Sequence, residues 1–315
     1  MNENLDKCVV SILMITYNHE KYIERAINSV IKQNVDFTYE LIIGDDHSSD
    51  NTKVICEGFQ NKYPAILRYE RNFENIGMQQ NFLKTYKRCS GKYIALLEGD
   101  DEWVANDKLK KQVELLEYRQ DVILCYSNAY ILDTLNPESN VYFNSNKPIV
   151  EICRDEIFAH CVIPTCTVLF RNKIEIPIWW VQTNAQAYFL YYLLANFGKF
   201  YYMDEVFALY NHHYLGMSRM TKIDKMLVED TMLSYNLEKY CNNDISFRKI
   251  LISKHFRAID DLFHKKAFRA AVSLFWRLKF DFIIDNREFV LIGIKTFFKI
   301  HFLFFLSKRL NKTVY

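Results

Sequence analysis

KYIALLEGDDEW, residues 92–103, is the stretch of sequence that decides the fold. Its apolar run stops abruptly at three acids, Glu98, Asp100 and Asp101. An apolar run closed by a glycine-containing acidic turn is typical of a central strand in an α/β sheet, and ligands of such sheets bind outside the carboxyl ends of the strands. Carboxylates crowded at that place repel one another unless a cation lies between them. Because hard oxygen ligands suit Mn²⁺ or Mg²⁺, the stretch predicts a divalent cation bound with the phosphates of a nucleotide diphosphate. An acidic turn without a ligand is the alternative, since the motif is short.

Two further apolar runs in the first hundred residues also end in polar side chains. VVSILMITYN ends in Tyr17 and Asn18, and ELIIGDDHSSDNT places Asp45 and Asp46 directly after its apolar residues. Apolar residues spaced three and four apart follow the first run, which indicates a helix. Strands that alternate with helices predict a parallel, doubly wound sheet whose strand ends meet in one crevice. The alternative for the two aspartates is structural, because Asp in such turns often caps backbone amides.

These segments together resemble a known family. The order TYNHEKYIERAINSVIKQ, ELIIGDDHSSDNT, NFENIGMQQNFLKTYKRCSGKYIALLEGDDEW and DKLKKQVELLE is similar to the nucleotide-sugar-binding half of family 2 glycosyltransferases, of the kind found in bacterial polysaccharide synthesis. The resemblance covers about the first 120 residues. It implies the α/β GT-A fold, which is Rossmann-like, and inverting transfer of a hexosyl or N-acetylhexosaminyl group from a nucleotide sugar, with a UDP-sugar favoured, to a glycan acceptor.

The resemblance also implies which residues form the site. Tyr17 and the two neighbouring aspartates match residues that hold the base and ribose, and a segment after residue 71 matches one that passes over the donor. The implied donor-binding residues are Tyr17, Asn18, Asp45, Asp46, Asn75, Gly77, Asn81, Glu98 and Asp100. The implied ligands of Mn²⁺ or Mg²⁺ are Asp100, Asp101 and His213. The family more commonly has Asp where Glu98 stands, although the longer carboxylate still reaches a ribose hydroxyl or a water on the metal.

The middle of the chain is expected to form the acceptor side. IPTCTVLFRNKI, residues 163–174, is predicted to be a strand that brings Thr165 to the acceptor pocket. Trp179 and Trp180 are candidates for stacking on a sugar, because an aromatic ring matches the apolar C–H face of a pyranose. The alternative is that both tryptophans are large core residues.

The largest departure from the family is at Ala187. The frame QAYFLYYLLANFGKFYYMDE, residues 186–205, matches one in which the family has the Asp that deprotonates the acceptor hydroxyl. A positioned general base is worth ~10²–10⁴ in rate, and alanine cannot accept a proton. The chain is an engineered variant, a natural protein that lost or moved its base, or a sequence in a different register; the intact donor motifs favour engineering. A non-catalytic nucleotide-sugar-binding protein is therefore the alternative function.

Composition restricts the remaining possibilities. The chain has 315 residues, 50% of them hydrophobic, which predicts one large domain with an appendage rather than disorder. Its eight cysteines have no CxxC spacing, so we expect neither a zinc site nor disulfides, in a reducing compartment. The start of the sequence lacks the pattern of a signal peptide, which favours the cytoplasm. A dinucleotide oxidoreductase is disfavoured, because no G-x-G-x-x-G follows a predicted strand.

The last hundred residues change character. We expect a GT-A domain over residues 1–220 and a helical, basic and aromatic region over residues 221–315. From Leu262 to Tyr315 the sequence has 11 Lys or Arg against 3 acids, with many Phe among them. This pattern predicts peripheral binding to the anionic inner face of the cell membrane, and hence a lipid-linked acceptor. Its runs without Lys or Arg are too short to span a bilayer. A packed helical bundle is the alternative, and nucleic-acid binding is not expected without a recognition motif.

Overall fold

The computed structural model describes residues 8–133, 141–146, 149–154, 163–182 and 186–213. The chain divides into two units, Met1–Met220 and Thr221–Tyr315. All described residues belong to the first unit. The predicted basic helical region lies outside the described residues, so the functional division of the chain into two domains stays a prediction.

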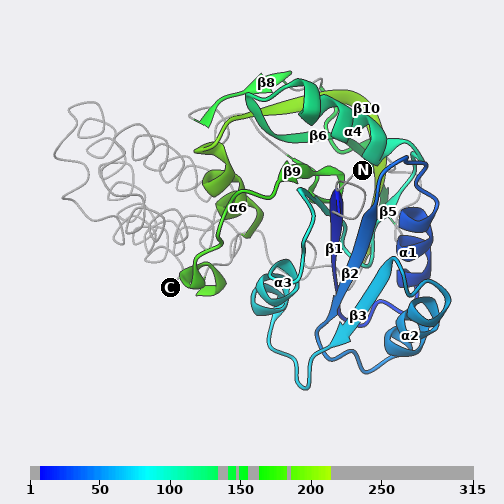
Figure 1. Ribbon diagram of the computed structural model, residues 1–315. Coiled ribbons are helices and arrows are strands. Elements are labelled where there is room, and N and C mark those ends of the chain that lie inside the picture. Colours follow the sequence, from blue (N-terminus) through cyan, green and yellow to red (C-terminus); the bar gives the residue numbers. More distant parts are fainter. Residues whose placement is uncertain (1–7, 134–140, 147–148, 155–162, 183–185, 214–315) are drawn as a thin grey trace, which may run out of the picture. The chain divides into compact units, whose positions relative to one another are not determined.

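The described residues form one sheet, in which strands follow the order β3-β2-β1-β4-β9-β6-β10-β5 (Figure 1). β1 pairs in parallel with β2 and β4, and β2 pairs in parallel with β3. Two short strands lie off this path, β7 beside β6 and β8 beside β10. The strands are β1 (Val10–Thr16), β2 (Tyr39–Asp45), β3 (Leu67–Arg71), β4 (Tyr93–Leu96), β5 (Glu102–Trp103), β6 (Val122–Asp133), β7 (Val141–Tyr142), β8 (Glu151–Ile152), β9 (Leu169–Arg171) and β10 (Lys199–His212).

Helices cover both faces of the parallel half of the sheet. α1 and α2 lie on one face and α3 lies on the other (Figure 1). In α1, the predicted spacing of three and four residues puts the buried side chains on one side of the helix. The helices are α1 (Ile23–Ile31), α2 (Thr52–Lys62), α3 (Met78–Tyr86), α4 (Lys108–Tyr118) and α6 (Gln186–Ala195). The predicted α/β class is thereby confirmed.

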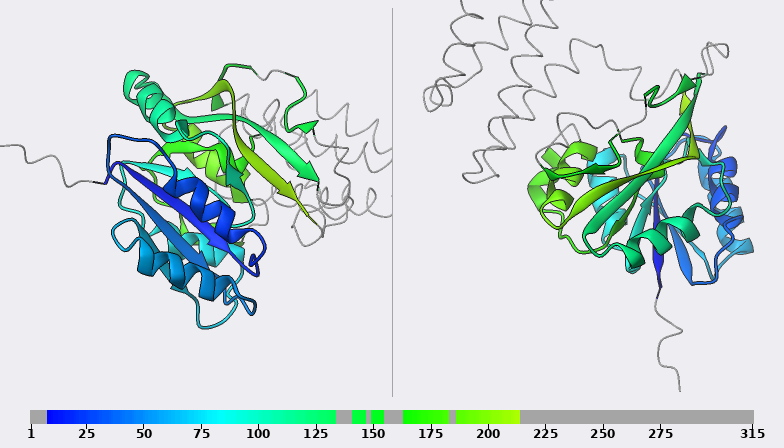
Figure 2. Two further views of the ribbon diagram at one scale, coloured as in Figure 1. Left: turned by 90° about the vertical axis from the view of Figure 1, so that its right-hand side faces the viewer. Right: turned by 90° about the horizontal axis from the view of Figure 1, so that it is seen from above.

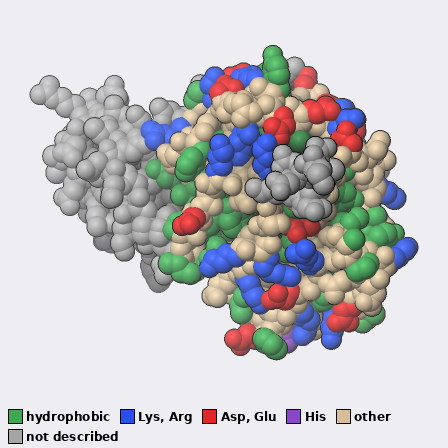
Figure 3. All heavy atoms as spheres, in the orientation of Figure 1, with side chains coloured by type: hydrophobic (Ala, Val, Ile, Leu, Met, Phe, Trp, Pro, Cys, Tyr) green, Lys and Arg blue, Asp and Glu red, His purple; other side chains and the backbone are tan. Residues whose placement is uncertain are grey.

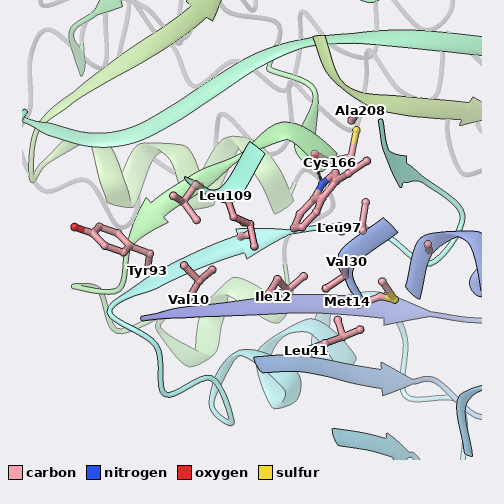
Figure 4. Close-up of a cluster of buried hydrophobic side chains, with 14 of the residues drawn as sticks. Val10, Ile12, Met14, Val30, Leu41, Tyr93, Leu97, Leu109, Cys166 and Ala208 are labelled. Carbon is pink, nitrogen blue, oxygen red and sulfur yellow. Dashed lines mark hydrogen bonds between the residues drawn. The ribbon is translucent and has the colours of Figure 1, made fainter. Parts of the chain in front are cut away.

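The core lies between these helices and the strands. Val10, Ile12 and Met14 alternate along β1 on one side of the sheet, and Val30 of α1 packs near them (Figure 4). All four side chains are fully buried. The apolar runs of the sequence therefore became central strands because both of their faces are covered, as is usual for parallel sheets.

The parallel pairing predicted for the first strands is confirmed, but the second half of the sheet is mixed. β9 pairs antiparallel with both β4 and β6, whereas β6 and β10 run parallel and side by side (Figures 1 and 2). The predicted strand at residues 163–174 is a 3₁₀ turn, η2 (Thr165–Thr167), followed by β9. The turn η2 leads directly into β9, which enters the sheet antiparallel to its two neighbours. No helix within the described residues is long and apolar enough to cross a membrane.

A buried lysine links α4 to the sheet. The side chain of Lys108 is fully buried, and its Nζ donates to Gln112 Oε1 at 2.7 Å and lies 4.1 Å from the centroid of the Trp103 ring. Gln112 Nε2 in turn donates to the carbonyl of Thr167 at 2.8 Å. Burial lowers the pKa of Lys108 from its ordinary value of 10.5 to about 7. The folded chain therefore binds this proton less tightly than the unfolded chain does.

Lys108→Met should stabilise the fold, with the largest gain at low pH. Below pH 7 the lysine is charged in both states and its burial costs free energy, which is recovered as the pH rises through 7 toward 10.5. We expect the free energy of unfolding to increase by at least ~1 kcal/mol at pH 6 and by much less at pH 10, measured by urea denaturation. Lys110→Met, at an exposed position of the same helix, is the control. A loss of stability at pH 6 would show that the contact with Trp103 outweighs the burial cost.

Candidate functional site

The loops that follow β1 and β2 are held together by hydrogen bonds. The backbone N–H of Asn18 donates to Ser48 Oγ at 2.9 Å, and Asn18 Oδ1 accepts the N–H of Ser49 at 2.8 Å. The N–H of His19 donates to Thr52 Oγ1 at 2.9 Å. Asn18 has a φ of 55°, a left-handed conformation that Asn adopts more readily than most residues. This predicted donor-binding residue therefore turns the chain at the end of β1 and fixes the neighbouring loop.

Asp45 shapes the loop at the end of β2. Its carboxylate is fully buried and accepts hydrogen bonds from the N–H of Ser48 at 2.9 Å, from Ser48 Oγ at 2.6 Å and from the Tyr69 hydroxyl at 2.7 Å. Tyr17 differs, because its side chain is 46% exposed directly after β1. Tyr17 is thus accessible to a ligand in this structure, whereas Asp45 is occupied by protein contacts. The predicted role of both residues in donor binding stays a prediction.

Asp46 fastens the segment that follows β3. Its two carboxylate oxygens accept the N–H of Ile76 at 2.8 Å and the N–H of Gly77 at 2.9 Å, and Oδ1 also accepts a hydrogen bond from Asn72 Nδ2 at 3.1 Å. Gly77 has a φ of 87°, which L side chains rarely adopt, so glycine is required at this turn into α3. Asn75 is exposed on the same segment. Asp46 therefore positions the segment that the sequence predicts to pass over the donor.

Asn81 lies in the interior, between α3 and β2. It is 2% exposed, its Nδ2 donates to the carbonyl of Gly44 at 2.8 Å, and its Oδ1 accepts from Asn72 Nδ2 at 3.0 Å. A Cβ at Gly44 would lie 2.0 Å from Thr85 Oγ1, so α3 approaches β2 closely at this point. The polar side chain of Asn81 satisfies a backbone carbonyl that this close packing would otherwise isolate. Its assignment to donor binding stays a prediction.

Glu98, Asp100 and Asp101 crowd the turn after β4. Glu98 Oε2 is buried and has no hydrogen-bond partner among the described residues. Burial, together with the charge of Asp100, raises the pKa of Glu98 to about 7. Burial and the two neighbouring acids hold the pKa of Asp101 well above its ordinary range. The turn therefore carries more carboxylate charge than its surroundings can accommodate.

Two histidines from distant parts of the chain face Asp100. His213 Nε2 lies 3.0 Å from Asp100 Oδ2, and His19 Nε2 lies 3.7 Å from the same oxygen. Burial alone would raise the pKa of Asp100, but His19 and the hydrogen bond with His213 bring that pKa below its ordinary value. The His213 ring also stacks on Tyr22 with centroids 4.6 Å apart. Asp100 is thus the one acid of the turn that stays charged most easily.

Asp100 and His213 supply part of the coordination that a divalent cation needs. In an octahedral site with bonds of about 2.1 Å, neighbouring ligand atoms lie roughly 3 Å apart, which is the separation of His213 Nε2 and Asp100 Oδ2. The unpartnered oxygen of Glu98 lies in the same turn. No group of three His, Cys, Asp or Glu side chains is arranged to hold a metal within the part of the chain that the structure describes. A cation here would need oxygens from a ligand or water, as Mg²⁺ commonly has in sites that bind phosphates.

Asn211 holds the acidic turn against β10. Its backbone N–H donates to Asp101 Oδ1 at 2.8 Å, and its Nδ2 donates to the carbonyl of Asp100 at 2.6 Å. The sequence indicated neither this contact nor the approach of His19 to the acidic turn. His19 directly follows a predicted strand end, and this signal was sufficient to include it. Asn211 carried no comparable signal.

On the acceptor side, the structure corrects one assignment. Trp180 is fully buried and packs on Phe82 with ring centroids 5.0 Å apart, so it is a core residue and does not offer a face to a sugar. The side chain of Trp179 lies outside the described residues. Thr165 is partly exposed in the turn η2. Ala187 is the second residue of α6 and is partly exposed, and the residues before this helix, 183–185, are outside the described part.

Solved structures share this fold. The structure of TarS from S. aureus in complex with UDP-GlcNAc matches with a TM-score of 0.65 and 16% identity, over 95% of this chain and 92% of that chain. A mannosyltransferase from Pyrobaculum calidifontis in complex with GDP-Man and Mn²⁺ matches with a TM-score of 0.60 and 13% identity, over 92% and 84% of the two chains. The sheet and its acidic strand end thus define a protein of the GT-A fold class.

The sequence narrows this class to one family. Residues 11–176 match the family described as Glycosyl transferase family 2, and the chain belongs to that family. An uncharacterized protein of Mycobacterium tuberculosis is 28% identical over 219 residues, which cover 69% of this chain and 62% of the relative. The Escherichia coli UDP-Glc:alpha-D-GlcNAc-diphosphoundecaprenol beta-1,3-glucosyltransferase WfgD is 29% identical, over 59% of this chain and 70% of WfgD. The chain thus matches less than two thirds of the length of the mycobacterial relative.

Proposed function

We propose that the chain transfers a hexosyl or N-acetylhexosaminyl group from a nucleotide-diphosphate sugar to a hydroxyl of a glycan, with inversion at the anomeric carbon. The observation that carries the proposal is the buried acidic turn, where Asp100 Oδ2 and His213 Nε2 lie 3.0 Å apart beside an unpartnered oxygen of Glu98. Family membership supports the reaction class. A UDP-sugar is the favoured donor, because TarS was solved with UDP-GlcNAc and WfgD is named for UDP-Glc.

In this proposal some of the described residues would bind the cation or the donor directly, and others hold the loops around them. Asp100, Asp101 and His213 would hold Mn²⁺ or Mg²⁺ together with oxygens of the diphosphate or water, and the cation would supply positive charge against the departing diphosphate. Tyr17, at the exposed end of β1, contacts the base. Asp46 holds the 72–77 segment over the donor through its backbone N–H bonds. Asp45 keeps the loop after β2 in place through its hydrogen bonds with Ser48 and Tyr69. The donor would therefore bind to loops whose conformation the fold has already fixed.

Asp100→Asn should weaken donor binding in the presence of Mn²⁺ and leave the fold intact. The amide loses the charge that attracts the cation, so we expect the affinity for UDP-glucose or UDP-GlcNAc to fall at least about tenfold, measured by calorimetric titration with and without Mn²⁺. Asp36→Asn, at an exposed position away from the turn, is the matched control. Equal, metal-independent affinity in the Asp100 variant and the control would remove the basis of the proposal.

Ala187 leads to a second proposal, that turnover by this chain is slow because the acceptor hydroxyl lacks a general base. Ala187→Asp should then raise turnover by ~10²–10⁴ with little change in donor affinity. Ala187→Asn, which has the same shape and accepts no proton, is the control. Product formation on a GlcNAc-diphosphate-lipid acceptor is followed by mass spectrometry.

Full activity of the unchanged chain would place the base elsewhere. Tight donor binding without turnover in either variant would favour the alternative, a non-catalytic nucleotide-sugar-binding protein.

We further propose that residues 221–315 bind the inner face of the cell membrane and that the acceptor is lipid-linked. The support is the sequence, with 11 basic and 3 acidic residues from Leu262 onward. The attraction of each basic residue to anionic lipid is worth about 1 kcal/mol near the surface. The acceptor named for WfgD, a diphosphoundecaprenol, is consistent with a lipid-linked substrate.

Replacing Lys308, Arg309 and Lys312 by Gln should reduce flotation with phosphatidylglycerol vesicles, and salt should reduce flotation of the unchanged chain. Phosphatidylcholine vesicles serve as the uncharged control. Equal flotation of both proteins with both lipids would favour a packed helical bundle.

A further inference from the structure

β6 and β7 present an exposed pair of aromatic rings. Tyr130 is 41% exposed and Tyr142 is 46% exposed. Their ring centroids lie 4.4 Å apart, and the hydroxyl of Tyr130 donates to that of Tyr142 at 2.8 Å. We call these two residues the tyrosine pair. Neither ring is part of the core or of the site described above, so the pair needs a different explanation.

The backbone fixes the geometry of the tyrosine pair. Tyr130 and Tyr142 are direct partners in the antiparallel pairing of β6 and β7, which puts both side chains on the same face. β7 is only two residues long, but Asn128 secures the chain beyond it. Asn128 Oδ1 accepts the N–H of Asn144 at 3.0 Å, and its Nδ2 donates to the carbonyl of Asn144 at 3.0 Å. The rings are therefore held in place before any ligand binds, which lowers the entropy cost of binding.

The tyrosine pair shares a sheet face with the candidate site. In the parallel pairing of β6 and β10, Tyr130 is the partner of Leu209, and Asn211 stands two residues further along β10. Residues two apart on a strand point to the same face, so the buried Asn211 lies on the same face of the sheet as the tyrosine pair, about 7 Å further along the strand. Asn211 Nδ2 donates to the carbonyl of Asp100. The opposite face is marked by Phe143 and Tyr210, whose rings meet edge to face at 5.7 Å.

The size and chemistry of the tyrosine pair favour a sugar ring as its occupant. An aromatic face covers the apolar C–H face of a pyranose, and the hydroxyl at the ring edge can bond to the sugar's own hydroxyls. Two rings are too small for a stable protein interface, which buries roughly 800 Å² on each partner. The separation from Asn211 is about the length of one or two sugar units. The surface is thus suited to a glycan that extends away from the acidic turn.

We propose that Tyr130 and Tyr142 form a subsite that stacks a sugar unit of the acceptor glycan, further from the acidic turn than the unit that receives the new sugar. The identification of the glycan as the acceptor rests on the proposed function. The stacking itself rests on the exposure, spacing and fixed orientation of the two rings. The subsite gives the protein a preference for acceptors of two or more units over single sugars.

Saturation-transfer NMR on the full chain tests the subsite directly. The probes are chitotriose, cellotriose, maltotriose and mannotriose at millimolar concentration, each compared with its monosaccharide. We expect transfer to the ring C–H protons of at least one trisaccharide and much weaker transfer to its monosaccharide. Tyr142→Ala should weaken trisaccharide binding on the order of two- to tenfold, because one aromatic face is lost.

Two further variants separate stacking from loss of structure. Tyr142→Phe keeps the ring and should retain most of the binding, which a general disruption of β7 would not allow. Tyr118→Ala removes a tyrosine that is 84% exposed on α4 and should leave binding unchanged. No transfer to any trisaccharide, or equal transfer in Tyr142→Ala and the unchanged chain, would overturn the proposal. A dimer in light scattering that Tyr142→Ala abolishes would also overturn it, since a second copy would then cover the pair.

Titration of the same samples with UDP-GlcNAc and Mn²⁺ separates the two proposals. Normal donor binding without trisaccharide binding means that the subsite is wrong while the proposed function stands. Trisaccharide binding that depends on Tyr142, without any donor binding, means that the subsite stands and the proposed function fails.

Discussion

The crowding of three carboxyl groups in a buried turn is the constraint on which the rest of the site depends. Gly99 lets this turn press against the end of β1, since its N–H donates to the carbonyl of Ile15 at 3.0 Å and a Cβ there would lie 2.8 Å from Thr16 Oγ1. Burial, together with repulsion from the neighbouring Asp100, raises the pKa of Glu98 to about 7. A bound cation would offset the repulsion among these carboxylates. The neighbours of the turn are arranged accordingly, with imidazole nitrogens and no lysine or arginine among the contacts of Asp100 described above.

In this structure the polar residues at the ends of β1 and β2 mainly form hydrogen bonds to neighbouring loops of the protein. Asp46 binds two backbone N–H groups of the segment after β3, and Asn18 binds the loop after β2. Under the proposed function, a donor that binds at these strand ends meets loops that are already ordered, which reduces the entropy lost on binding. The structural interpretation of the aspartates and a role in donor binding are therefore compatible, because a residue that fixes a binding loop affects the affinity for the ligand.

β10 connects the acidic turn with the second half of the sheet. It runs from the core beside β6 to the acidic turn, and Asn211 at its end bonds to both Asp100 and Asp101. The same strand is the neighbour of Tyr130, so one element fixes the distance between the acidic turn and the tyrosine pair. On the face shown in Figure 3, acidic and basic side chains are interspersed among the described residues. The distance between the acidic turn and the tyrosine pair thus depends on the register of β10 and β6, and not on a surface charge of a single sign.

The sequence by itself determined the strands that end in acids, the helix α1 and the α/β class of the first half of the sheet. It could do so because the buried residues of a single strand or helix recur at a regular spacing along the chain. It also located Asp100 and Asp101 correctly at a strand end. Only the tertiary structure decided that β9 runs antiparallel, that Trp180 lies in the core and that His19 and Asn211 reach the acidic turn. The hydrogen bond between His213 and Asp100 joins residues 113 positions apart. Such a contact depends on how every intervening element packs, and no periodicity along the chain carries that information.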